Sequence, residues 1–419
     1  MTTAAFLILL VIGMPIGLIL CIAALVYILD SGNPLLLDSY PLKLFTSLDN
    51  FGLLAIPLFI LIGELMNGAG ITTRLVRLAA AFVGALKGGL AYINLLANMM
   101  VASILGSATA QIAMMSQVMV PEMQRAGYSK PFAAGLTAFG GLLGPIIPPS
   151  IVFVVYAVLA QVAVRDMLIA GILPGLMLTG LFILTVAALG ARHAYPQGVR
   201  LSWPERLRAL RDALPMLLIP VVIIGTILGG YGSPTEAAAI GAVVAALIGF
   251  LYTRSLKLRD IPQILLRTGL NTALVLFLVA AAGVFSWVLI FGQVPQRAAV
   301  WIQSVATTPM GFMLLVLVVL LIVGTVIDGI PGLIMVVPIL LPIATEVYGI
   351  HPLHFGVVVS INLILGLLSP PVGIGLYVAA SVSNVSAVRV FWVAIPFFLV
   401  AIAALVILAL VPWFSLALL

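Results

Sequence analysis

Charged residues are scarce in this chain, and their scarcity excludes a water-soluble protein. Only 7% of the 419 residues are Asp, Glu, Lys or Arg, and 64% are hydrophobic. A soluble domain usually carries about a quarter charged residues. The apolar residues form long blocks, such as 168–190 and 390–411, and about 20 residues suffice for a helix to cross a bilayer. The composition predicts an all-α, multi-pass membrane protein.

Cysteine is almost absent too. Cys21 is the only one, so disulfides and cysteine-based metal sites are excluded. It lies in the apolar block 6–29, which we interpret as a retained first span, because no basic region precedes it and no small-residue cleavage site follows it. The net charge of +6 does not indicate a nucleic-acid partner, because the basic residues lie between the apolar blocks, where they report topology.

Two basic segments set the expected orientation of the chain. Residues 191–212 and 254–267 together hold half of the 18 Lys and Arg residues. By the positive-inside rule both segments are cytoplasmic. The two spans between them, 213–228 and 235–252, bring the chain back to the same side, so the two assignments agree.

The flanking segments extend this topology. Residues 30–50 are acidic on balance and are expected outside, whereas 72–87 are basic and are expected inside as an amphipathic helix. The N-terminus is then cytoplasmic and the C-terminus periplasmic. The chain is expected to make about nine full spans in addition to two hairpins.

An internal repeat appears when the chain is shifted by 222 residues. Gly89 then meets Gly311, Pro174 meets Pro396, and the Pro-Pro pair at 148–149 meets the pair at 370–371. The first copy begins with a span at 51–67 that crosses inward, and the second with a span at 270–291 that crosses outward. The copies are therefore predicted to be inverted, a recurrent design of secondary transporters.

This repeat divides the chain into four parts of a single membrane domain. They are 1–50 with the first span and a periplasmic loop, repeat 1 at 51–190, the basic loops and connecting spans at 191–267, and repeat 2 at 268–419.

Each repeat contains a predicted re-entrant hairpin. The first covers 88–124 with a small, hydroxyl-rich tip at 106–109, and the second covers 310–345 with a tip at 328–332. A broken span follows each hairpin, at 131–160 and at 355–382.

The breaks themselves are rich in proline and glycine, at 144–150 and at 369–373. Proline frees backbone carbonyls one turn earlier, and such groups are tolerated in a membrane only where protein or a water-filled cavity satisfies them. They can coordinate sodium, while restarted half-helices direct positive ends at an anion. Proline kinks are also common in membrane helices, but two matched pairs of breaks favour a binding site.

Asp328 is the most informative single residue. A carboxylate within a membrane is costly unless it is paired or solvated, which indicates function. The alternative is that Asp328 caps the next helix, with Pro331 in its first turn, and both roles are compatible. Glu236 is explained by capping, and Glu64 by pairing with a basic loop residue. Interhelical hydrogen bonding is as good an explanation as ligation for four polar residues: Asn94, Asn98, Ser103 and Asn362.

Five motifs give the chain a resemblance to a known family. They are IPLFILIGELM at 56–66, GSATA at 106–110, GPIIPPS at 144–150, SPTEAAA at 233–239 and SPPVG at 369–373. With these motifs in this order, the sequence resembles the large membrane subunit of the tripartite ATP-independent periplasmic (TRAP) transporters over its whole length. The second break begins with Ser369 where threonine is often expected, and a hydroxyl is retained.

The resemblance implies sodium-driven uptake of an organic acid, such as a C4-dicarboxylate or sialic acid, across the bacterial inner membrane. It implies an elevator-type movement, a separate small four-span subunit, and a periplasmic binding protein that delivers the anionic substrate. Sodium is the only cofactor expected. Its predicted ligands lie in the two tips and breaks: Ser103, Gly106, Ser107, Gly144, Pro145, Ile327, Asp328, Ser369, Pro370 and Gly373. The substrate is expected between the tips, at Ser107, Thr109, Pro149, Ser150, Asp328 and Gly329.

The sequence also bears on other functions. A sodium/dicarboxylate-type transporter or a channel would work without a binding protein, but a channel needs a continuous polar pore, and no polar stripe runs along any span. The sequence contains neither the H-E-x-x-H motif of metalloproteases nor a P-loop, which argues against an enzyme or an ATP-driven pump. A structural scaffold is the remaining alternative.

Overall fold

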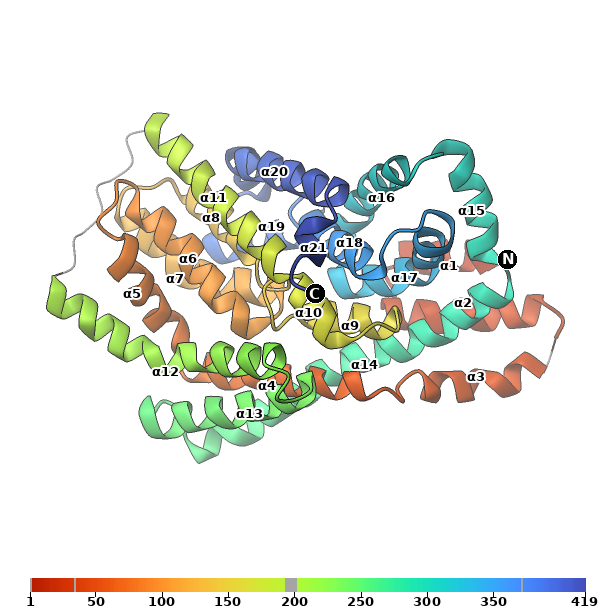
Figure 1. Ribbon diagram of the computed structural model, residues 1–419, viewed down its shortest axis with the longest axis horizontal. Coiled ribbons are helices and arrows are strands. Elements are labelled where there is room, and N and C mark those ends of the chain that lie inside the picture. The colour runs from red at the N-terminus through yellow and green to blue at the C-terminus, as the bar shows by residue number, and fades with distance from the viewer. Residues whose placement is uncertain (1, 34, 193–201, 371) are drawn as a thin grey trace.

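The computed structural model describes residues 2–33, 35–192, 202–370 and 372–419. The regular elements of the described chain are helices, and seven of them are long and apolar enough to cross a membrane, or eight if the bent pair 294–324 is one span. Its longest axis runs along the long helices α12 and α14 (Figure 1). The α-helices are α1 (Thr2–Val11), α2 (Ile16–Asp30), α3 (Leu35–Thr46), α4 (Ala55–Gly68), α5 (Ile71–Val83), α6 (Gly89–Leu105), α7 (Ala108–Arg125), α8 (Lys130–Gly141), α9 (Ile151–Leu159), α10 (Val164–Ala170), α11 (Ile172–Arg192), α12 (Trp203–Leu228), α13 (Pro234–Leu247), α14 (Ile261–Phe291), α15 (Val294–Val305), α16 (Pro309–Gly324), α17 (Gly329–Pro342), α18 (Pro352–Gly366), α19 (Ile374–Ser383), α20 (Ala387–Leu410) and α21 (Trp413–Leu416).

The N-terminal segment differs from the prediction of one span at 6–29. α1 ends in a turn in which Gly13 takes a left-handed conformation (φ +80°) and Met14 N–H donates to the Leu9 carbonyl, the pattern that terminates many helices. Pro15 then precedes α2, which packs against α1. The chain therefore folds back on itself.

The two arms of this N-terminal hairpin run in opposite directions along α14. Gly17 at the start of α2 abuts Phe277, and Tyr27 near its end reaches Gly292. Phe6 of α1 stacks on Phe285, and Thr2 and Asp30 line one cavity. The N-terminus thus lies at the same end of the molecule as Asp30. This contradicts the prediction that the N-terminus and Asp30 lie on opposite sides of the membrane.

Three further segments are more helical than predicted. The outside segment 30–50 contains α3, and α12 already begins at Trp203, so Arg206, Arg208 and Arg211 lie on that helix rather than in a loop. α14 likewise begins at Ile261 and includes Arg267. Arg192 ends α11, and Arg200 lies outside the described residues.

Two polar assignments from the sequence are confirmed. Ser233 and Glu236 form a reciprocal capping box at the start of α13, with 2.6 Å from Ser233 N to Glu236 Oε2. Glu64 at the end of α4 lies 4.0 Å from Arg267 Nη1. The predicted amphipathic helix is α5, which buries Ile71, Leu75 and Leu78.

The same order of elements occurs twice in the chain. A span-length helical segment, a short helix, a two-helix hairpin, a broken helix and a long helix appear in α4–α11 and again in α14–α20. The first copy has one additional short helix, α10, before α11. In Figure 1, α5–α7 lie towards the left-hand end and α15–α17 towards the right-hand end. Below them α12, α13, α4, α14 and α3 form a lower layer along the length of the molecule.

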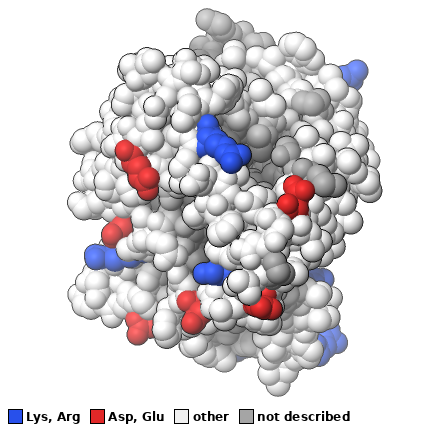
Figure 2. All heavy atoms as spheres, turned by 90° about the vertical axis from the view of Figure 1, so that its right-hand side faces the viewer, with Lys and Arg blue, Asp and Glu red and all other residues white. Residues whose placement is uncertain are grey.

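The two ends of the long axis differ in their charged residues. Figure 2 views the end that holds the N-terminus and α15, where acidic and basic side chains are interspersed among uncharged atoms. The arginines of α12 lie towards the opposite end, where that helix begins (Figure 1). This asymmetry agrees with a cytoplasmic left-hand end under the positive-inside rule.

Candidate functional site

The first hairpin tip packs directly on the first helix break. α6 ends at Gly106, which has a left-handed φ of +61°, and Ser107 leads into α7. A methyl group built on Gly106 would lie 3.3 Å from the Pro149 carbonyl oxygen and from Ile151 Cγ1. Only a residue without a side chain fits this approach at an unstrained positive φ. The predicted tip at 106–109 is therefore two residues shorter, because Ala108 and Thr109 already belong to α7.

The first break is held by its own hydroxyl. Ser150 is fully buried and caps α9: its Oγ donates to the Pro145 carbonyl at 2.5 Å and accepts from Phe153 N at 3.2 Å. Because both functions of the hydroxyl are used, Ser150 shapes the break rather than presenting a free group. The Pro148–Pro149 peptide is cis.

The second tip also packs directly on the second break, through backbone contacts. α16 ends at Gly324 and α17 begins at Gly329, so the tip is 325–328 rather than the predicted 328–332. Gly373 N donates to the Thr325 carbonyl at 3.0 Å, which ties the break to the tip. Gly324 and Gly366 touch backbone to backbone, so hairpin and broken helix are in close contact.

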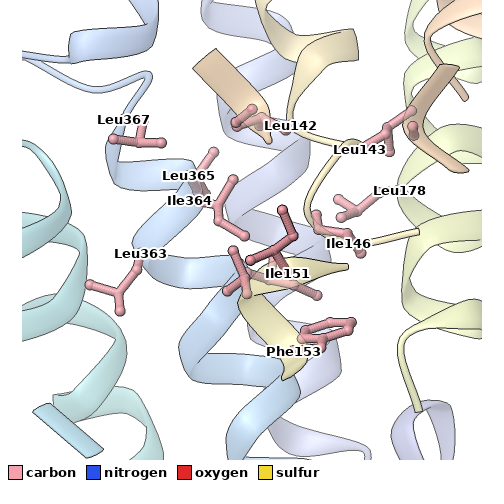
Figure 3. Close-up of a cluster of buried hydrophobic side chains, with 14 of the residues drawn as sticks. Leu142, Leu143, Ile146, Ile151, Phe153, Leu178, Leu363, Ile364, Leu365 and Leu367 are labelled. Carbon is pink, nitrogen blue, oxygen red and sulfur yellow. The ribbon is translucent and has the colours of Figure 1, made fainter. Parts of the chain in front are cut away.

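The two tip–break pairs share one buried core. α19 packs against α7, and α9 packs against α17, so each half supplies a helix to the other. Ile112 of α7 lies between Gly141 at the first break and Gly375 just after the second. Figure 3 shows side chains from the first break, Leu142 and Ile146, in the same cluster as Ile364 and Leu365 of α18.

Comparison with known proteins identifies this architecture. Residues 3–414 match the family described as "Tripartite ATP-independent periplasmic transporter, DctM component". The chain belongs to this family.

Two relatives illustrate the likeness. The chain is 38% identical to the C4-dicarboxylate TRAP transporter large permease protein DctM of Pseudomonas aeruginosa, with 91% of this chain and 89% of that protein covered. It is 34% identical to the sialic acid TRAP transporter large permease protein SiaM of Vibrio cholerae, with 97% and 95% covered. This chain is therefore a TRAP transporter large permease subunit and a multi-pass protein of the inner membrane.

A solved structure shares the fold. The YdaH transporter of Alcanivorax borkumensis, described as having an unusual topology, superposes with a TM-score of 0.65 at 15% identity, covering 91% of this chain and 89% of that one. At this identity the likeness concerns the fold alone.

Asp328 in this TRAP permease caps α17 and is exposed. Its Oδ1 accepts from Gly329 N at 2.7 Å, and Gly332 N donates to its carbonyl oxygen. The capping role is thus confirmed. The carboxylate of Asp328 lies at the surface of the tip, next to buried Ile327 and Gly329. An exposed tip carboxylate is free to meet a solute.

The other predicted site residues divide into exposed and enclosed groups. Ser107 and Thr109 are half-buried, with their hydroxyl oxygens 3.4 Å apart, and Pro370 is exposed. Ser103 and Ser369 are buried and donate to carbonyls on their own helices, Met100 and Gly366. The enclosed backbone positions are Gly106, Gly144, Pro145, Pro149 and Gly373.

The carbonyl and hydroxyl oxygens at the tips and breaks are suitable ligands for a hard monovalent cation. Both breaks present backbone carbonyls: a methyl group on Gly373 would lie 2.8 Å from the Ser369 carbonyl oxygen, and one on Gly144 would lie 3.3 Å from that of Ser107. Among the residues that the structure describes, no three His, Cys, Asp or Glu side chains gather. Carbonyl and hydroxyl oxygens are the donors that alkali cations take in membrane proteins.

Gln111 was missed by the sequence analysis. It is fully buried one turn into α7, and its Oε1 would lie 2.7 Å from a methyl group on Gly144. A polar side chain in an apolar helix was the only signal for it, and interhelical hydrogen bonding explains such residues equally well.

Proposed function

We propose that this permease subunit drives uptake of an organic carboxylate with the sodium gradient, and that a periplasmic binding protein delivers the substrate. The observation that supports this best is the pairing of each hairpin tip with a helix break, and the meeting of both pairs in one core. The relatives named for C4-dicarboxylate and sialic acid transport support the substrate class.

Sodium is proposed to bind at both tip–break pairs, and the substrate between them. α7 and α17 begin at the tips, and α9 and α19 begin at the breaks. Each start carries the partial positive charge of a helix N-terminus, which attracts a carboxylate. Carbonyl oxygens released at the breaks and the tip hydroxyls attract the cation. The half-buried Ser107 and Thr109 near one tip and the exposed Asp328 at the other are proposed to meet the solutes.

The movement is proposed to be of the elevator type. Hairpins and broken helices interlock through α7, α9, α17 and α19, which favours their motion as one unit. The lower layer would be the fixed scaffold, joined by α5 and α15. The recurring order of elements and the opposite placement of the hairpins support two inverted repeats, which serve alternating access in other transporters.

The small four-span subunit and the binding protein are proposed as partners because the family is a component of a tripartite system. The alternative is a transporter that works alone, and a single experiment separates the two. The permease is reconstituted in liposomes with its small subunit, and uptake of radiolabelled succinate and sialic acid is measured with and without the binding protein and with sodium or choline outside.

We expect uptake only with the binding protein and an inward sodium gradient. Inside-negative potential should accelerate it, since moving one net charge is worth about 2.3 kcal/mol per 100 mV. Uptake that persists in choline would refute sodium coupling, and uptake without the binding protein would refute the tripartite mode.

A further inference from the structure

A chain of buried polar side chains links the first hairpin to the first broken helix. Asn94 Nδ2 donates to Thr137 Oγ1 at 2.7 Å, Asn98 Nδ2 to Asn94 Oδ1 at 2.7 Å, and Gln111 Nε2 to Asn98 Oδ1 at 3.0 Å. Thr137 Oγ1 in turn donates to the Ala133 carbonyl. All four side chains are completely buried. The chain, here called the amide ladder, therefore joins α6, α7 and α8 across the apolar interior.

The orientation of every amide in the ladder is fixed. Besides its side-chain contact, Asn98 Nδ2 donates to the Asn94 backbone carbonyl at 2.9 Å, and Gln111 Nε2 donates to the Asn98 backbone carbonyl at 2.8 Å. A backbone carbonyl only accepts, so neither amide can be turned round. The ladder thus has all its donors pointing away from the hairpin tip, and it ends in an acceptor, Gln111 Oε1.

That terminal oxygen faces the tip–break junction. No described residue donates a hydrogen bond to Gln111 Oε1. A methyl group on Gly144 would meet this oxygen at 2.7 Å and the carbonyl oxygens of Ser107 and Gly141 at 3.3 Å each. Three oxygens from α7, the tip and the end of α8 therefore lie close to the Cα atom of Gly144, and none of them can donate. The Ser107 and Gly141 carbonyl oxygens each accept one backbone hydrogen bond, from Gln111 N at 3.1 Å and from Gly144 N at 3.2 Å, and each has a second lone pair.

We propose that Gln111 supplies its side-chain oxygen to the coupling sodium ion at the first tip–break pair, and that Thr137, Asn94 and Asn98 position it. A buried amide oxygen without a donor is unfavourable, and convergence with two carbonyl oxygens makes a cation the matching ligand. This inference rests on the proposed sodium coupling and adds a residue and its supporting network to it.

The test measures the sodium concentration that gives half-maximal uptake, in the reconstituted complete transporter, with choline replacing sodium. Gln111→Met keeps the length of the side chain and removes both amide groups. We expect it to raise that concentration about tenfold, in line with the loss of one contact to a charged partner, while the maximal rate and the dependence on binding-protein concentration change little. Thr137→Val leaves Gln111 in place and should give a smaller increase in the same direction.

Ser116→Ala is the matched control. Ser116 is equally buried on α7, and its hydroxyl has no partner among the described residues, but it lies more than a turn away from the tip region. Its sodium dependence should equal that of the parent. A second measurement needs no transport: sodium chloride, compared with choline chloride, should raise the melting temperature of the purified parent by preferential binding to the folded state. It should raise that of Gln111→Met markedly less.

The outcomes are distinct. If the parent itself shows no sodium dependence, the proposed coupling fails. If the parent depends on sodium and both Gln111→Met and Thr137→Val keep its half-maximal concentration, this inference is wrong and the coupling stands. A loss of maximal rate or of stability alone would assign the ladder a purely structural role. If Gln111→Met is not recovered as monodisperse protein, Thr137→Val and its sodium dependence decide the question.

Discussion

At the scale of single residues, polar groups in this permease divide by whether their hydrogen bonds are already made. Ser150, Ser103 and Ser369 donate to nearby carbonyls and so hold the backbone at a tip or break. Asp328 keeps one contact, to Gly329 N, and is exposed. Groups of the first kind are expected to affect folding when changed, and groups of the second kind to affect transport.

Asp328→Asn tests this distinction. The amide oxygen can still accept from Gly329 N, so the cap and the melting temperature should be kept within a small shift. The negative charge is lost, and we expect uptake in proteoliposomes to fall by about tenfold, as expected for loss of one charged contact near the solutes.

Asp38→Asn is the control for that change, because Asp38 is an exposed carboxylate on α3, away from both tips. It should transport like the parent. Unchanged kinetics of Asp328→Asn would reduce Asp328 to a helix cap.

At the scale of elements, the positions of the tips and breaks could be predicted from helix-breaking residues. Features that depend on tertiary contacts could not. Gly106, the proline pair at 148–149 and Gly373 marked the tips and breaks to within a few residues, because proline and left-handed glycine act locally. Gln111 escaped notice because its importance comes from the ladder that fixes its amide, and that ladder exists only once α6, α7 and α8 are packed together.

The N-terminal hairpin was not predicted from the sequence for a different reason. An apolar block of this length satisfies the requirement for a single span, and the turn signals within it, Gly13 and Pro15, are also tolerated in membrane helices. The choice between one straight span and a hairpin depends on the packing of α1 and α2 along α14, with Phe6 on Phe285. No local sequence pattern specifies this packing.

Thiol labelling tests this hairpin. In a background with Cys21→Ser, single cysteines at Thr2 and Ser31 should react with a membrane-impermeant maleimide added from the same side of intact cells or spheroplasts. Ser255→Cys, in the basic segment before α14, should react only after the membrane is permeabilised. A straight first span would protect Thr2→Cys in intact spheroplasts while Ser31→Cys reacts, and that result would contradict the hairpin.

At the scale of the whole molecule, the question is which parts move together. A cavity of about 630 Å³ lies between α1, α2 and α14 on one side and α17 on the other, with Leu289 and Ile339 among its lining residues. α17 belongs to the interlocked hairpins, and α14 to the lower layer. If the hairpins slide as one unit against this layer, the cavity lies on the sliding boundary.

Cross-linking across this boundary should therefore stop transport. We expect the pair Leu289→Cys and Ile339→Cys, bridged by a reducible bifunctional thiosulfonate, to lose most uptake in the Cys21→Ser background and to recover it after dithiothreitol. The pair Tyr27→Cys and Gly292→Cys is the control, because Tyr27 of α2 approaches Gly292 just after α14, and α2 packs on α14 of the lower layer. Its cross-link should leave uptake intact, since it joins parts that do not move relative to each other. Full uptake by the bridged Leu289–Ile339 pair would contradict an elevator movement along this boundary and would require a mechanism in which the tips open without displacement of α17.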